Sequence, residues 1–201
     1  GEADGSGSMP VLLVLMLLSG CGEDTPAETP APTGTILAQG ESFVVMEEHS
    51  GGVTKYSYTI KDKAGKELES AICAKQPLVA AINDDLLGVR FYVNDKTFCR
   101  YYDLKNSRVS ESFFNAFWDN GKLVAYHDYD NGHRMMVRDM FNANGYYYEQ
   151  KLDVQALSIT VTACEQNEET GELNVTYTYG DTGTEHEITL PTKPAEPEDA
   201  E

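Results

Sequence analysis

The chain has 201 residues and a formal net charge of -18, because 33 Asp and Glu outnumber 15 Lys and Arg. This length suits one domain with a single sizeable core once the polar ends are set aside. An anionic surface repels nucleic acid and anionic lipid head groups, which argues against both as partners. The 12 Tyr and the many Thr fall in alternating runs, a composition typical of half-buried strands.

An apolar run from Pro10 to Leu18 dominates the start of the chain. The run is too short to span a bilayer as a helix, but it matches the hydrophobic region of a secretion signal. Residues 1–20 are therefore expected to be a signal segment. No Lys or Arg precedes the run, so residues 1–8 read as a cloning remnant or a misplaced start.

The apolar run ends in Leu18-Ser19-Gly20-Cys21, which resembles the lipobox of bacterial lipoproteins. In that family, small residues before the cysteine fit the signal peptidase, and the thiol is lipidated before cleavage. The resemblance implies that Cys21 begins the mature protein and carries a diacylglycerol. It also implies a lipid anchor in the cell membrane or outer membrane, with the domain outside the cytoplasm. The alternatives are an ordinary signal peptide and a buried strand with a chance cysteine.

The stretch that follows the cysteine is rich in Pro, Thr and acidic residues. Residues 21–40 are expected to form a semi-rigid tether, because this composition has too few apolar residues to build a core. Residues 192–201 repeat the composition and are expected to be a disordered acidic tail. The folded domain is thus predicted to span residues 41–191.

Within those limits, apolar and polar residues alternate with a period of two, which predicts strands with one buried face. No window shows a helical period bounded by caps, so the domain is predicted to be all-β. The residues expected to share a face in each strand are Thr54, Tyr56, Tyr58 and Ile60; Leu173, Val175, Tyr177 and Tyr179; and Ile159, Val161 and Ala163.

Four stretches of the domain can be laid over one another, starting at Val44, Val89, Leu123 and Thr160. Each reads as three strands joined by turns, which predicts about four antiparallel β-meander repeats. Residues 101–110, YYDLKNSRVS, resemble the outer turn of a β-propeller blade, and the resemblance implies a propeller-like array of no identified family. A β-sandwich or an open barrel would give the same pattern.

The segment HDYDNGH, residues 127–133, is the first candidate site. Its candidate metal ligands are His127, Asp128, Asp130 and His133, since imidazole nitrogen and carboxylate oxygen are usual ligands of transition metals. The alternative is a solvated hairpin closed by a tight Asn-Gly turn. Apart from such a metal and the diacylglycerol, no cofactor is expected.

The second candidate site is aromatic. Trp118, Phe117 and Tyr147 lie near turns, where such rings would stack on a sugar or a peptide side chain. The alternative is that they belong to the core. Three further cysteines, Cys73, Cys99 and Cys164, cannot all pair within the chain; two would be bridged, or all would be buried thiols.

No catalytic residue is nominated, because the sequence has no nucleophile elbow, zinc-protease motif or phosphate-binding glycine loop. The leading hypothesis is a membrane-anchored binding or interaction module, whose partner is an envelope glycan, peptide or protein. The alternatives are a small envelope hydrolase with its site at one end of the β repeats, and a structural or assembly lipoprotein.

Overall fold

The structure is a computed structural model that describes residues 34–130, 132–180 and 183–194. The predicted signal segment, Cys21 and most of the predicted tether lie outside these residues, as does the tail beyond residue 194.

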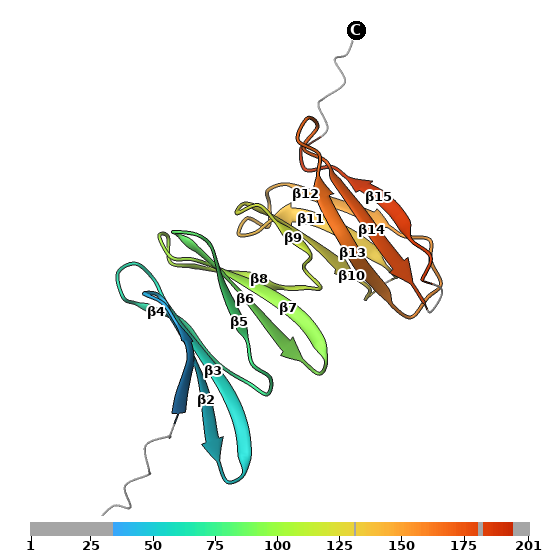
Figure 1. The fold of residues 1–201 in the computed structure, drawn as a ribbon. Coiled ribbons are helices and arrows are strands. Elements are labelled where there is room, and N and C mark those ends of the chain that lie inside the picture. Colours follow the sequence, from blue (N-terminus) through green and yellow to red (C-terminus); the bar gives the residue numbers. More distant parts are fainter. Residues whose placement is uncertain (1–33, 131, 181–182, 195–201) are drawn as a thin grey trace, which may run out of the picture. The chain divides into compact units, whose positions relative to one another are not determined.

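Fifteen strands form four antiparallel sheets in the described part of the chain (Figure 1). The first sheet contains β1 (Gly34–Gln39), β2 (Phe43–Ser50), β3 (Val53–Lys61) and β4 (Glu67–Cys73). The second contains β5 (Leu78–Asn83), β6 (Leu86–Val93), β7 (Lys96–Asp103) and β8 (Arg108–Phe114). The third contains β9 (Trp118–Asp119), β10 (Leu123–Asp128), β11 (Arg134–Asp139) and β12 (Tyr147–Lys151). The fourth contains β13 (Ile159–Gln166), β14 (Leu173–Tyr179) and β15 (His186–Leu190).

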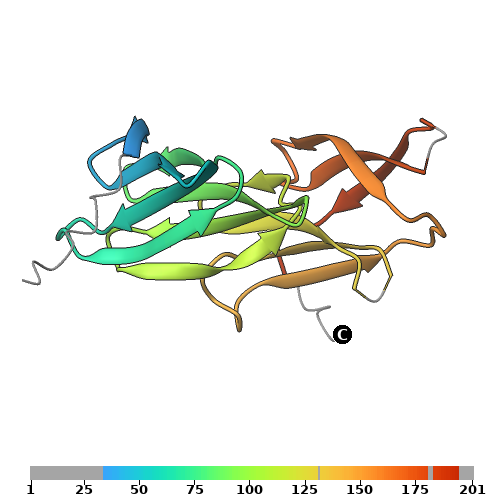
Figure 2. The same cartoon turned by 90° about the horizontal axis from the view of Figure 1, so that it is seen from below.

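Each sheet is a meander, because every strand pairs with the strands next to it in sequence (Figures 1 and 2). The four stretches that overlay in the sequence fall in four different sheets. The prediction of an all-β fold built from antiparallel meander repeats is therefore confirmed. The described residues contain no helix and no closed barrel.

Successive sheets pack face to face through three apolar clusters. Val45, Tyr58 and Ile60 of the first sheet pack against Val89 and Tyr102 of the second. The next two clusters join the second sheet to the third and the third to the fourth. The second and third sheets are thus covered on both faces, so consecutive residues are buried in β6, β7, β10 and β11.

Three strands lie outside the sequence repeats, and each is the first strand of its sheet: β1, β5 and β9. Strand β1 lies inside the stretch assigned to the tether, and it pairs with β2 from Gly34 opposite Glu48 to Gln39 opposite Val44. All six of its residues are exposed, so burial leaves no pattern in them. Composition alone cannot separate such an edge strand from a linker.

One residue lies on the opposite face from that expected. The alternation placed Ala163 with Ile159 and Val161, but a bulge follows Val161 and shifts the register of β13. Ala163 then pairs with Thr176 and is exposed, while Cys164 packs against the core. A bulge adds one residue and reverses the face of all that follow, and the sequence carries no signal for it here.

The turn after the third strand of each four-stranded sheet begins with an aspartate. The carboxylate of Asp62 accepts hydrogen bonds from the backbone N–H groups of Ala64 and Lys66, at 2.9 and 2.8 Å. It also accepts a hydrogen bond from the hydroxyl of Ser107, in the β7–β8 turn of the next sheet, at 2.5 Å. The bond from Ser107 is the largest cause that lowers the pKa of Asp62 below its usual range, and the bonds from the backbone N–H groups add to it. The same role falls to Asp103 in the second sheet and Asp139 in the third.

Candidate functional site

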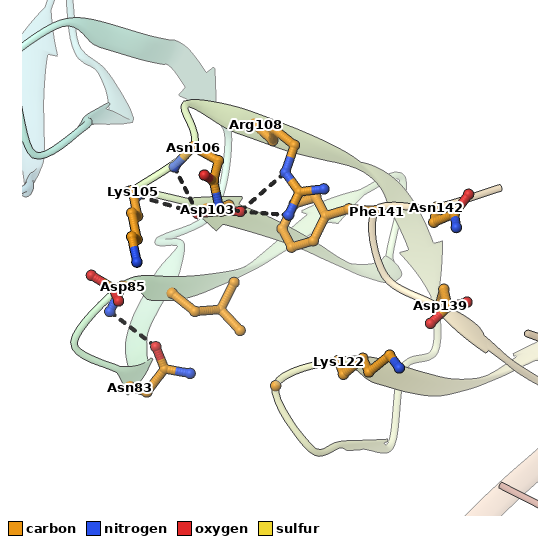
Figure 3. Close-up of a pocket in the computed structure, with 12 residues that line it drawn as sticks. Asn83, Asp85, Asp103, Lys105, Asn106, Arg108, Lys122, Asp139, Phe141 and Asn142 are labelled. Atoms are coloured by element: carbon orange, nitrogen blue, oxygen red, sulfur yellow. Dashed lines mark hydrogen bonds and ion pairs between the residues drawn. The ribbon is translucent and has the colours of Figure 1, made fainter. Parts of the chain in front are cut away.

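A cavity of about 460 Å³ opens between the second and third sheets, at the end where these aspartate turns lie (Figure 3). We call it the turn cavity. Four turns contribute to it: β5–β6, β7–β8, β9–β10 and β11–β12. The twelve lining residues are Asn83, Asp85, Leu86, Asp103, Lys105, Asn106, Arg108, Gly121, Lys122, Asp139, Phe141 and Asn142.

One wall of the turn cavity is held rigid by Asp103 (Figure 3). One carboxylate oxygen accepts from the backbone N–H groups of Lys105 and Asn106, at 3.2 and 3.0 Å. The other accepts from Nε and Nη2 of Arg108, at 3.0 and 2.7 Å, and from the amide of Asn106. Burial raises the pKa of Asp103, but these hydrogen bonds outweigh burial and keep the pKa below its usual range.

Arg108 also connects this wall to the opposite one. Its guanidinium lies over the ring of Phe141 in the β11–β12 turn, 4.8 Å from the ring centroid. This cation–π contact crosses between the second and third sheets. Together with the buried Leu86, Phe141 gives the cavity a small apolar surface between polar walls.

Other polar groups of the lining are left for a ligand. Lys105 and Lys122 are exposed, and neither ammonium forms an ion pair with any carboxylate of the described residues. Asp85 is exposed as well, and its backbone N–H donates to the side chain of Asn83 at 2.9 Å. Asp139 is buried and accepts a hydrogen bond from the backbone of Tyr146.

The turn cavity therefore offers ammonium and amide donors, carboxylate and amide acceptors, and an apolar patch. None of its twelve lining residues is Ser, Cys or His, so the lining supplies no hydroxyl, thiol or imidazole for nucleophilic catalysis. The lining is chemically suited to a ligand rich in hydrogen-bonding groups.

The structure does not bring the three predicted aromatic residues together. Phe117 and Trp118 are half-buried and pack against the core between the third and fourth sheets. Tyr147 is 52% exposed on β12, and its hydroxyl donates to Glu149 at 2.8 Å. Of the three, Phe117 lines a cavity, a second one that also contains His127.

Two of the four predicted metal ligands do meet. Nε2 of His127 lies 2.9 Å from Nδ1 of His133, and both rings are buried. Asp128 instead pairs with Arg134 at 3.2 Å, and Asp130 is exposed. Within the described residues, no three His, Cys, Asp or Glu side chains converge as a metal site requires, so metal binding stays a prediction.

None of the lining residues of the turn cavity was predicted from the sequence as a site residue. Residues 101–110 stood out as a blade-like turn, but no ligand was inferred from them. A usable signal exists, since an Asp or Asn that begins a turn recurs as Asn83, Asp103, Asn120 and Asp139. The side chains of Asn83, Asp103 and Asn120 accept hydrogen bonds from backbone N–H groups two or three positions on. Asp139 accepts from the backbone N–H of Tyr146, seven positions on, and each bond fixes its turn.

The three cysteines of the domain are free: Cys73 and Cys99 are buried, and Cys164 is partly buried. Burial raises the pKa of each thiol, which opposes formation of a reactive thiolate. No helix in the described residues has the length and hydropathy needed to cross a membrane. Comparison with protein-family models, with curated proteins and with solved structures finds no match to this chain.

Proposed function

We propose that this chain is a lipid-anchored binding module outside the cytoplasm, and that its turn cavity binds an envelope glycan. The observation that carries the proposal is the mixed lining of that cavity. Sugar hydroxyls donate and accept hydrogen bonds, and the face of a sugar ring is apolar. Lys105, Lys122 and Asp85 supply the polar contacts, and Phe141 with Leu86 supplies the apolar one.

The anchor part of the proposal rests on the lipobox-like sequence before Cys21. Expressed in a bacterium, the full chain is expected in the membrane fraction, and the Cys21→Ser variant is expected in the soluble fraction. Fractionation followed by mass spectrometry of the N-terminal peptide would measure both the location and the acyl group. Equal membrane association of the two proteins would contradict lipid anchoring.

The binding part is tested by thermal-shift measurements of the full chain with a panel of envelope oligosaccharides. One of them is expected to raise the stability, by about 2.7 kcal/mol at a hundredfold excess over Kd. Lys122→Ala and Lys105→Ala are expected to weaken binding of that sugar by about tenfold each, since each removes a charged donor. The unfolding temperature without sugar should stay unchanged, because both side chains are exposed.

Lys55→Ala is the matched control, since Lys55 is an exposed lysine on β3 outside the turn cavity. It is expected to bind the sugar as the unmodified chain does. The proposal fails if no oligosaccharide stabilises the chain, or if the Lys122 and Lys55 variants bind equally well.

A further inference from the structure

The second cavity, of about 420 Å³, is formed by residues of the second, third and fourth sheets. We call it the His127 cavity. It is separate from the turn cavity, with which it shares no lining residue. Its lining consists of Arg90, Thr97, Asn115, Ala116, Phe117, His127, Ile159, Thr160 and Val161.

The hydrogen bonds of the histidine pair fix the proton positions in the neutral rings. Nε2 of His133 lies 2.7 Å from the carbonyl oxygen of Ala156. A carbonyl only accepts, so Nε2 of His133 carries the proton and its Nδ1 is an acceptor. Nε2 of His127 must then donate to that Nδ1, at 2.9 Å. The lone pair of His127 is therefore on Nδ1.

This leaves a hydrogen-bond acceptor on a buried residue of the cavity lining. His127 is 2% exposed, and no described residue donates a hydrogen bond to its Nδ1. A ligand with an N–H or O–H group would satisfy the acceptor.

Arg90 is the one charged residue among the lining residues of the cavity. One guanidinium nitrogen donates to the carbonyl of Ala116 at 3.4 Å, and no described carboxylate lies within ion-pair distance. The nearby Asp119 carboxylate accepts instead from the hydroxyl of Tyr101, at 3.3 Å. The lining is thus locally cationic although the whole chain is acidic, which favours an anionic ligand group.

The remaining lining combines neutral polar groups with an apolar wall. Asn115 has a φ of 47°, and its backbone N–H donates to the carbonyl of Thr97 at 2.9 Å. Asparagine tolerates this left-handed backbone conformation better than most residues. The hydrogen bond to Thr97 fixes the backbone of Asn115, which carries the amide side chain at the cavity. Phe117 and Ile159 give the apolar wall.

We infer that the His127 cavity binds the C-terminal end of a short peptide. Its carboxylate would pair with Arg90, the amide N–H would donate to Nδ1 of His127, and an apolar side chain would pack on Phe117 and Ile159. A volume of about 420 Å³ lies in the range of small-ligand sites and suits one or two residues. The inference is independent of glycan binding at the turn cavity.

The test is isothermal titration calorimetry of the full chain with acetyl-Ala-Val and with its C-terminal amide. The free acid is expected to bind, and the amide is expected to bind at least about tenfold more weakly, because it lacks the charge that Arg90 recognises. Arg90→Gln is expected to weaken the acid by a similar factor and to leave the amide unchanged. Lys55→Gln, outside the cavity, should bind both peptides as the unmodified chain does.

A second readout addresses His127 directly. The ¹⁵N resonance of its Nδ1 is expected to shift on addition of the acid peptide, because a hydrogen bond to a bare imidazole nitrogen changes its shielding. Four results would overturn the inference: no binding at millimolar peptide, equal affinity for acid and amide, an Arg90→Gln variant that binds the acid normally, or an unchanged Nδ1 resonance at saturation.

Discussion

Acidification from pH 7 to pH 4 is expected to lower the free energy of unfolding by about 3 kcal/mol through His127 alone. The pKa of this ring is about 4 in the folded chain, against an ordinary value of 6.5. Well above pH 6.5 the ring is neutral in both states and contributes no pH dependence. Between pH 6.5 and pH 4 the ring is protonated to a greater extent in the unfolded chain than in the folded chain, so the free energy of unfolding falls as the pH falls. Urea unfolding at a series of pH values measures this slope.

The His127→Phe variant separates this effect from that of the carboxylates. Phenylalanine does not titrate, so the stability of the variant should depend less on pH than that of the unmodified chain between pH 6.5 and pH 4. Carboxylates whose pKa is lowered, such as Asp103, lose their contribution at still lower pH. His49→Gln is the control, since His49 is exposed. Parallel curves for the unmodified chain and His127→Phe would refute the prediction.

Arg100→Met is expected to destabilise the fold by about 2 kcal/mol, because it removes the charged partner of a half-buried carboxylate between the first and second sheets. Glu69 accepts hydrogen bonds from Nη1 of Arg100 and from the hydroxyls of Tyr102 and Tyr58, the last two at 2.9 and 3.4 Å. Without the guanidinium, only the neutral tyrosine hydroxyls remain as donors to the carboxylate. Urea unfolding at pH 7 gives the change.

The tyrosines of this network make the interface specific. The hydroxyls of Tyr58 and Tyr102 lie 3.1 Å apart, and burial is the main cause that raises the pKa of Tyr58 to about 12. Both hydroxyls therefore stay protonated at pH 7 and serve as donors. Adding Glu69→Leu to Arg100→Met is expected to restore part of the lost stability, since no unpaired charge remains.

An exposed ion pair provides the comparison for Arg100. Lys75 and Asp95 approach to 2.5 Å with side chains 57% and 87% exposed. Lys75→Met is expected to leave the free energy of unfolding nearly unchanged, because solvent screens such a pair. Equal losses for the two variants would mean that burial at Glu69 has no special effect.

The fold was predictable to the extent that burial leaves a pattern in the sequence. Apolar and polar residues alternate strictly in β3 and β14. These strands belong to the first and fourth sheets, and each of these sheets packs against another described sheet on one face only. In the second and third sheets, which are covered on both faces, buried runs such as Leu86 to Val89 carry no such alternation. Strand β1 is exposed throughout and carries no burial pattern, and it lies in a stretch whose composition predicts a tether.

The candidate sites were harder to predict because they form between sheets. The turn cavity collects residues from Asn83 to Asn142, and sequence spacing alone does not indicate that four separate turns share one opening. His127 and His133 were predicted to share one site, with Asp128 and Asp130, because a single hairpin holds them. The carbonyl of Ala156, which accepts a hydrogen bond from His133, belongs to a distant loop, and residue types give no hint of this contact.

The meander order has a consequence for how the chain acquires its structure. Every ladder in the described strands joins sequence neighbours, so the pairing of these strands does not wait for a remote segment. Loops closed during folding are short, and their entropic cost is correspondingly small. A chain emerging N-terminus first can therefore complete one sheet and offer its face as a template for the next. Assembly by successive addition, rather than a single collapse of the whole domain, is the route this connectivity favours.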